Sequence, residues 1–137
     1  MASQKVIRRI ISSSLSPTPV GPYNQAVLVD RTLYLSGVLG IDVKTAKLVE
    51  GGAAAEARRA LVNMGNILKE AGSDYDRVIK TTIFLQNMND FGGVNEVYKS
   101  FFKEPYPARS TFEVGKLPMG AQIEIEAIAV TGEVETI

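Results

Sequence analysis

The chain has 137 residues, of which 45% are hydrophobic, so one domain can bury a core without disulfide bonds or metal ions. The 15 basic and 15 acidic residues cancel, which argues against a broad electropositive surface for nucleic acids or anionic membranes. His and Cys are both absent, which excludes imidazole acid/base catalysis, thiol nucleophiles and nearly every transition-metal site.

These totals predict a single domain over residues 1–137, with an ordered core at about 5–131. No stretch approaches the roughly 20 apolar residues that span a bilayer, and the lack of Cys gives no disulfide framework. We therefore expect a cytoplasmic protein without membrane contact. Residues 1–29 contain basic residues but no acid, a composition also typical of mitochondrial presequences, so mitochondrial import is the alternative.

The first third of the chain has the pattern of three short strands. The apolar pattern predicts a strand at residues 5–11, followed by a Ser- and Pro-rich loop over residues 12–22. Two further apolar runs, at residues 26–29 and 33–38, are separated by only three residues. Such a short polar interruption between apolar runs is typical of a hairpin.

In the middle of the chain the apolar residues first have helical spacing and then the composition of a strand. Residues 53–71 carry apolar side chains at helical spacing, and Gly72 stands where a left-handed C-terminal cap belongs. Residues 77–85 are rich in β-branched and aromatic residues, which predicts a strand. Because its apolar positions do not alternate strictly, we expect this strand to be buried on both faces.

A second helix and two last strands complete the pattern. Asn89 or Asp90 can cap the helix, and Pro105 and Pro107 end it. Its expected buried stripe is Val94, Val97, Tyr98, Phe101 and Phe102. Strands are then expected at residues 109–114 and 122–130, with a turn at 117–120.

This order of elements predicts an α+β fold, a six-stranded mixed sheet with two helices on one face. Each helix is long enough to return the chain to a parallel neighbouring strand by a right-handed crossover. The last strand has apolar residues on both faces, so the face without helices also needs a cover. No element is left in the chain to provide it. We therefore expect a homo-oligomer in which sheets of identical copies face one another, with clefts where the subunits meet.

Arg109 and Glu124 are the candidate catalytic residues. A guanidinium can hold a planar carboxylate through two parallel hydrogen bonds, and an ionised carboxylate can activate water. Together these groups suffice for a modest hydrolysis. Two alternatives remain from the pattern alone: Arg109 can form a strand-edge salt bridge, and the alternation of residues 123–126 does not distinguish Glu124 from Glu126.

Several motifs, in order and with few gaps, closely resemble the reactive intermediate deaminase A family from about the first strand to Val130. They include Gly21-Pro22-Tyr23, Leu35-Ser36-Gly37, Asn89-Asp90-Phe91, Pro107-Ala108-Arg109 and the strand Ile123 to Val130. The resemblance implies a chorismate-mutase-like fold and a homotrimer with clefts between subunits. It also implies hydrolysis of 2-iminobutanoate and 2-iminopropanoate to 2-oxo acids and ammonia, without a cofactor or metal.

The resemblance also implies a role for each site residue. Arg109 would bind the carboxylate of the imino acid and Glu124 would activate water. The backbone at Ser36-Gly37 would contact the substrate, where Gly allows close approach of the main chain. The backbone carbonyl of Thr111 would hold the nitrogen end, so its side chain is replaceable. Tyr23 and Phe91 would form the pocket walls.

Structural explanations exist for the same residues. Tyr23 can anchor its loop, Phe91 can pack at the start of a helix, and Ser36-Gly37 can be a simple bulge. Two other functions also remain open. One is an endoribonuclease that inhibits translation, for which RNA would be the partner, but the absence of His and of a basic stripe disfavours it. The other is a non-catalytic module that binds small carboxylates or proteins, or acts as a chaperone.

Overall fold

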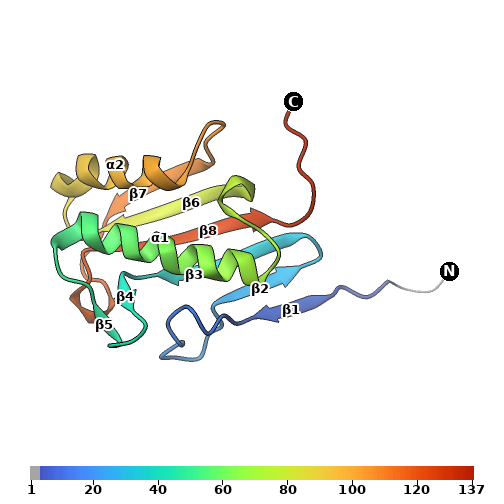
Figure 1. Cartoon of the computed structure of the whole chain (residues 1–137), viewed down its shortest axis with the longest axis horizontal. Helices are drawn as coiled ribbons and strands as arrows, with labels where there is room; N and C mark the ends of the chain where they lie inside the picture. The colour runs from blue at the N-terminus through green and yellow to red at the C-terminus, as the bar shows by residue number, and fades with distance from the viewer. Residues whose placement is uncertain (1–3) are drawn as a thin grey trace.

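A computed structural model of the chain describes residues 4–137, which form a six-stranded mixed sheet with two helices on one face (Figure 1). The strand order is β1-β2-β3-β8-β6-β7. The strands of this sheet are β1 (Arg8–Ile11), β2 (Ala26–Val29), β3 (Thr32–Val38), β6 (Val78–Leu85), β7 (Ala108–Glu113) and β8 (Ile123–Val130). The helices are α1 (Gly52–Glu70) and α2 (Phe91–Phe101). The expected α+β architecture is confirmed.

The N-terminal strands form an antiparallel meander. β2 and β3 make the expected hairpin, in which Val29 pairs with Thr32 across a turn with Asp30 at a φ of 52°. β1 begins at Arg8 rather than at residue 5. The reason is that β2 has only four residues and its last residue, Val29, already pairs with Arg8.

Helix α1 covers the middle of the sheet and provides most of the helical contribution to the core (Figure 1). Its apolar residues recur every three or four positions, so one face is buried on the strands. The buried apolar residues of this face are Ala53, Ala57, Ala60, Leu61, Met64, Ile67 and Leu68. Gly72 has a φ of 81° just beyond the helix, as expected of a C-terminal cap.

The connections through α1 and α2 lead to strands at different positions in the sheet. Helix α2 joins β6 to β7, which are parallel neighbours, as expected. Helix α1 instead leads from β3 to β6, and these strands are both antiparallel to β8, which lies between them. The expectation that each helix returns to an adjacent strand is therefore wrong for α1, since the last strand of the chain inserts at the centre of the sheet.

Three local features differ from expectation. The strand predicted to be buried on both faces is buried on one, where Thr81, Ile83 and Leu85 lie. Asp90 forms no side-chain cap on α2; the side chain of Asn87 instead accepts a hydrogen bond from the backbone of Asn89, in the 3-10 turn η2 (Met88–Asp90). The 3-10 turn η3 (Pro118–Gly120) lies at the turn expected over residues 117–120. Two further elements are the 3-10 turn η1 (Tyr75–Arg77) and a small hairpin of β4 (Ile41–Asp42) and β5 (Lys47–Leu48). The hairpin was not expected because two-residue strands have no apolar periodicity.

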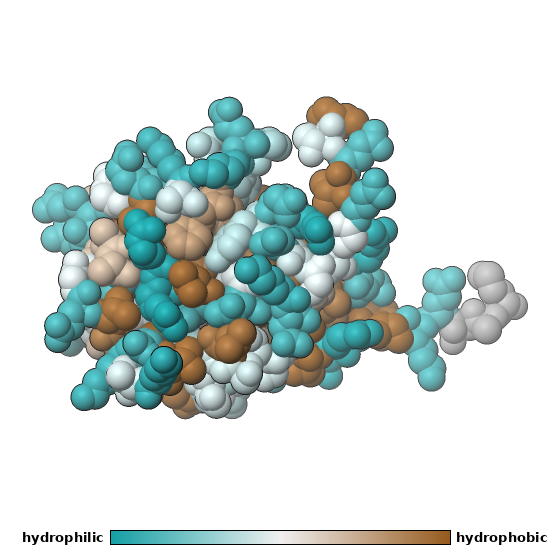
Figure 2. Space-filling view, viewed as in Figure 1, coloured by the Kyte–Doolittle hydropathy of each residue, from teal (hydrophilic) through white to brown (hydrophobic). Residues whose placement is uncertain are grey.

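The two faces of the sheet are unequal. The helix-covered face shows a mixture of hydrophilic and apolar residues to solvent (Figure 2). On the opposite face Ile10, Tyr34 and Phe112 are 49%, 50% and 51% exposed. Ile10 and Tyr34 lie in one row across β1, β2 and β3, because Val27 of β2 pairs with Ile10 on one side and with Tyr34 on the other. A single chain therefore leaves a partly apolar sheet face uncovered.

Candidate active site

One cavity of about 490 Å³ brings together four of the residues singled out in the sequence. Tyr23, Ser36, Gly37 and Glu124 all line it, and Glu126 lies beside them. Apolar side chains complete the walls, among them Val20, Ile41 and Met119. The cavity therefore combines a carboxylate with apolar surroundings, which is a common composition for a small-molecule site.

A bulge in β3 brings the main chain close to Glu124. The pairing of β3 with β8 shifts register between Leu35 and Val38, so Ser36 and Gly37 do form the bulge considered from the sequence. A β carbon on Gly37 would lie 2.6 Å from Cδ of Glu124, closer than real β carbons approach other atoms. Glycine at this position thus allows the backbone and the carboxyl group to touch.

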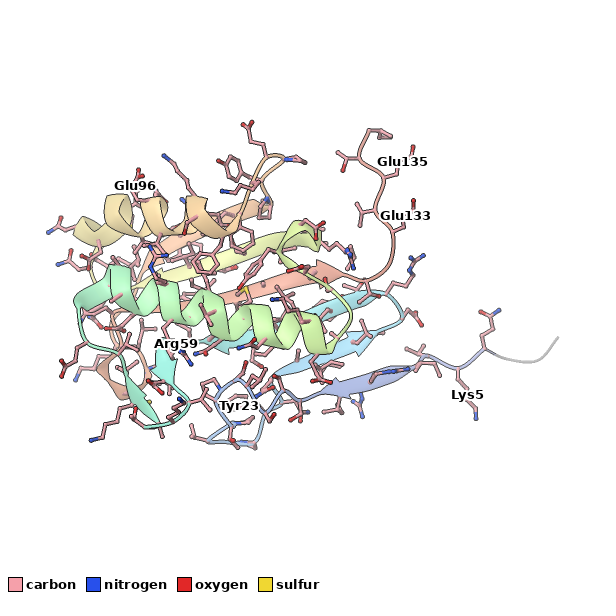
Figure 3. All side chains as sticks on the ribbon, viewed as in Figure 1. Lys5, Tyr23, Arg59, Glu96, Glu133 and Glu135 are labelled. Atoms are coloured by element: carbon pink, nitrogen blue, oxygen red, sulfur yellow. The ribbon has the colours of Figure 1, made fainter. Side chains whose placement is uncertain are left out.

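The loop that carries Tyr23 is held by a buried glutamine. The side-chain amide of Gln25 donates to the backbone oxygens of Ser13 and Pro17, at 3.1 and 2.9 Å, and its oxygen accepts from the Ser13 backbone at 2.7 Å. Tyr23 itself is half exposed, and its hydroxyl accepts a long hydrogen bond of 3.5 Å from the backbone of Val20. Figure 3 shows Tyr23 in this loop, below α1. The loop is firmly anchored while the tyrosine ring faces the cavity.

Burial changes the acidity of Glu124. Partial burial raises the pKa of its carboxyl group above the ordinary value, and the nearby charge of Glu126 raises this pKa further. A carboxylate with a raised pKa is a stronger base while it is ionised, so these surroundings suit proton transfer to and from water.

Arg109 lies on β7 and contacts aromatic residues of α2 rather than the residues of the cavity. Its guanidinium carbon lies 5.5 Å from the centre of the Phe91 ring and 4.8 Å from that of Tyr98. Arg109 takes part in neither of the two salt bridges found within residues 4–137. The strand-edge salt bridge considered from the sequence is therefore not formed, and the guanidinium is held by aromatic rings that leave its N–H donors for another acceptor.

Arg109 and Glu124 lie on opposite faces of the sheet. Arg109 and Ala127 are both register partners of Thr81, whose buried side chain faces the helices. Side chains alternate along a strand, so Glu124, three residues from Ala127, faces the other way. The aromatic pair Phe84 and Phe112, with ring centres 6.4 Å apart, lies on this second face, and Phe84 is the register partner of Glu124.

The predicted site residues thus form two groups within one chain. Tyr23, Ser36, Gly37 and Glu124 share the cavity, whereas Arg109 and Phe91 contact each other on the helix-covered face. Thr111 points to the same face as Arg109, two residues along β7, and does not line the cavity. One small ligand cannot bridge both groups of the same chain, because the sheet lies between them.

Tyr98 was predicted only as a core residue and is also a neighbour of Arg109. It is 5% exposed, as expected for the buried stripe of α2, yet its ring lies against the guanidinium. The seven-residue spacing between Phe91 and Tyr98 was the available signal, since residues two helical turns apart share one face. The sequence did not reveal which strand residue that face would meet.

Across residues 4–137, no three His, Cys, Asp or Glu side chains are grouped so that they could hold a metal ion. No helix in this same part of the chain has the length and apolar character needed to cross a membrane.

The fold and cavity define a small α+β protein with a carboxylate in a largely apolar pocket and a separate guanidinium on an aromatic surface. Residues 13–131 match the Endoribonuclease L-PSP family, and the chain belongs to this family. The resemblance to reactive intermediate deaminase A proteins that the motifs indicated is thereby confirmed.

Individual relatives match over nearly their whole lengths. The chain is 53% identical over 131 residues to the 2-iminobutanoate/2-iminopropanoate deaminase of Homo sapiens, covering 96% of both proteins. It is 56% identical over 131 residues to the RutC family protein UK114 of Drosophila melanogaster, covering 96% of this chain and 95% of the other. A crystal structure of TdcF from E. coli with bound serine matches with a TM-score of 0.85 and 37% identity, over 90% of this chain and 99% of that one.

Proposed function

We propose that this protein hydrolyses small 2-imino acids, such as 2-iminobutanoate and 2-iminopropanoate, to 2-oxo acids and ammonia. One observation carries the proposal: a partly buried carboxylate at a cavity, and a guanidinium that forms no salt bridge within residues 4–137, occur in a chain 53% identical to a human protein named for this activity. The E. coli relative with bound serine supports a ligand of the amino-acid class, with a carboxylate next to a nitrogen-bearing carbon.

Arg109 binds the substrate carboxylate in this proposal. Its planar guanidinium matches a carboxylate through two parallel hydrogen bonds, which a lysine ammonium cannot form. The Phe91 ring packs against the same side of the substrate. The backbone carbonyl of Thr111 accepts a hydrogen bond from the imine N–H group. Both residues lie on the Arg109 face of the molecule.

Glu124 transfers protons between water and the imine. It takes a proton from water as the water oxygen bonds to the imine carbon, and it returns this proton to the nitrogen. It then takes the hydroxyl proton of the resulting carbinolamine and again delivers it to nitrogen, so that the C–N bond breaks and ammonia leaves. Tyr23 and the backbone at Ser36-Gly37 contact the substrate from the walls of the cavity.

The complete site requires two copies of the chain. Arg109 of one copy and Glu124 of the next can approach one substrate if the copies pack through their uncovered sheet faces and edges. The half-exposed apolar residues of the sheet face support such packing, since monomers rarely expose large apolar patches. Three copies with three such sites is the arrangement that the family resemblance implies, and sedimentation of the purified protein tests it.

The activity is tested by coupling a threonine dehydratase to semicarbazide, which traps the released imine. The wild-type protein should suppress trapping, because it consumes the imine first. Arg109→Ala should abolish this effect, and Glu124→Gln should lower turnover more than binding of 2-oxobutanoate. Glu96→Gln, an exposed carboxylate on the outside of α2 (Figure 3), is the matched control and should behave like wild type. Equal suppression by all variants would contradict the assigned residues.

RNA cleavage is the rival activity, because the family itself carries the name endoribonuclease. The chain contains no His for acid/base catalysis and has no net charge. We therefore favour the imine over RNA. Cleavage that survives repurification and disappears in a point variant would reverse this preference. A non-catalytic carboxylate-binding or chaperone role would retain the dependence on Arg109 but would be insensitive to Glu124→Gln.

We propose the cytoplasm as the compartment, with the mitochondrion as the alternative. The basic, acid-free residues 1–29 motivate the alternative. Fractionation of cells that express the full chain with a C-terminal tag distinguishes the two.

A further inference from the structure

Tyr98 occupies an unusual position for a core aromatic residue. Its ring lies 4.8 Å from the guanidinium carbon of Arg109, while its hydroxyl lies 2.8 Å from the hydroxyl oxygen of Thr81 in the protein interior. Thr81 is also the register partner of Arg109 on the neighbouring strand. The three residues therefore connect two strands and α2 at one point, and the same tyrosine contacts both strand residues.

The contact has a consequence for the orientation of Arg109. An arginine side chain has many rotamers, and fixing it for two parallel hydrogen bonds has an entropic cost on binding. A ring placed against the guanidinium attracts it without using its N–H donors, whereas a carboxylate partner would occupy them. The donors at the edge of Arg109 thus stay available to a ligand.

The hydroxyl pair limits movement of the ring itself. Tyr98 is 5% exposed and also packs on Phe102, with ring centres 4.4 Å apart. The Thr81 hydroxyl adds a directional contact at the far end of the ring, so the ring cannot slide along the sheet without leaving two buried hydroxyl groups unpaired.

We propose that Tyr98 is a positioning residue for ligand binding: its ring, held by the Thr81 hydroxyl, orients the Arg109 guanidinium toward the substrate carboxylate. The inference rests on the proposed function, in which Arg109 binds that carboxylate. Tyr98 acts through Arg109 and does not touch the reacting atoms, so it affects binding much more than the proton transfers at Glu124.

The test compares Tyr98→Leu with Tyr98→Phe in the full-length protein. Removal of the ring in Tyr98→Leu should raise the Kd for 2-oxobutanoate and the KM for the imine by about tenfold, within the range of a partly desolvated cation–π contact. The kcat should change by less than about twofold, because Glu124 is unaffected. Tyr98→Phe, which keeps the ring, should recover most of the affinity.

A double-mutant cycle separates positioning from general stability. In an Arg109→Lys background, Tyr98→Leu should weaken 2-oxobutanoate binding by much less than tenfold, because the guanidinium it orients is gone. Equal losses in both backgrounds would overturn the inference. So would a Tyr98→Leu protein that binds 2-oxobutanoate as tightly as wild type.

Two controls keep the result interpretable. Tyr75→Leu removes a second tyrosine from the same aromatic cluster, where it packs on Phe101 and Phe102, but its hydroxyl donates to Leu61 rather than facing Arg109. It should lower the melting temperature without changing the Kd. If Tyr98→Leu does not fold, Thr81→Val is compared in the wild-type and Tyr98→Phe backgrounds. It should raise the Kd only where the Tyr98 hydroxyl is present, and a Kd unchanged in the wild-type background, or raised equally in both, would overturn the role of Thr81.

Failure of this inference can be told apart from failure of the proposed function. If wild-type protein neither suppresses imine trapping nor binds 2-oxobutanoate, the function itself is wrong and the inference falls with it. If wild type is active and Tyr98→Leu retains its KM, only the role of Tyr98 is wrong.

Discussion

Gly37 and Glu124 pack so closely that a side chain at position 37 would occupy the space of the carboxyl group. A β carbon on Gly37 would lie 2.6 Å from Cδ and 2.8 Å from Cγ of Glu124, and it would overlap Oε2. Gly37 does not have a left-handed φ, so the backbone itself would accept alanine. The contact with Glu124 is thus the specific reason for glycine in the bulge.

Gly37→Ala should therefore displace the Glu124 carboxyl group while leaving the fold intact. We expect kcat for imine hydrolysis to fall by about tenfold or more, because misplacement of a catalytic group by about 1 Å is costly. Gly115→Ala is the matched control, since a β carbon there meets nothing within 4 Å, and it should retain full activity. Steady-state kinetics with thermal unfolding of both variants makes the comparison, and an active Gly37→Ala protein would argue against Glu124 as the base.

Mixing two inactive variants tests whether the site lies between copies. Arg109→Ala and Glu124→Gln chains should each be inactive alone. After unfolding and refolding together, each mixed copy of the proposed trimer would contain one interface with both native residues, so about a quarter of all sites should be active in a random mixture. If both groups acted within one chain, activity would not return on mixing. Two samples refolded separately and then combined provide the baseline.

The pH dependence of turnover should report the Glu124 carboxyl group. Burial and the charge of Glu126 raise its pKa above 4.5, and the group must be ionised to accept a proton from water. The kcat should therefore decline as the pH falls through this raised pKa. Glu126→Gln removes the nearby charge and should move the acid limb to lower pH without abolishing activity. A limb that disappears in Glu126→Gln but persists in Glu124→Gln would reverse the two roles.

Glu56 on α1 should affect stability rather than catalysis. Its buried carboxylate accepts a hydrogen bond of 2.9 Å from the backbone of Gln122, next to the start of β8. Glu56→Ala leaves this N–H group without its partner, so the free energy of unfolding should fall by about 1–3 kcal/mol in urea titrations. Glu56→Gln keeps an oxygen acceptor and should be as stable as wild type at neutral pH, or more so.

The sign of the pH effect at Glu56 follows from its raised pKa. Burial raises the pKa of this carboxyl group above 4.5, the Gln122 hydrogen bond opposes the shift, and the charge of Asp90 adds to it. The folded state binds the proton more tightly than the unfolded state, so the stabilisation is complete below the unfolded pKa and is lost as the pH rises through the folded one. Glu56→Gln should reduce this decline, whereas Glu70→Gln at the exposed end of α1 should not.

Most of the secondary structure was predictable because it depends on the spacing of residues that are close together in the sequence. The helix at residues 53–71, its cap at Gly72 and the hairpin around Asp30 follow from spacing and turn chemistry, and all are confirmed. The position of β8 between β3 and β6 was not predictable, since strand order depends on pairing between residues far apart in the chain. The cavity around Glu124 was predicted in part: its four residues were named, but their separation from Arg109 was not.

The sequence by itself determined the main helices and the strands of the large sheet, the absence of imidazole and thiol chemistry, and the residue types available for binding an acid and activating water. Only the tertiary structure decided that Arg109 faces Tyr98 while Glu124 faces the opposite side of the sheet. The physical reason is that alternation fixes only the relative orientation of side chains within a strand. The register and order of the strands, which result from long-range packing against α1 and α2, assign each orientation to a face.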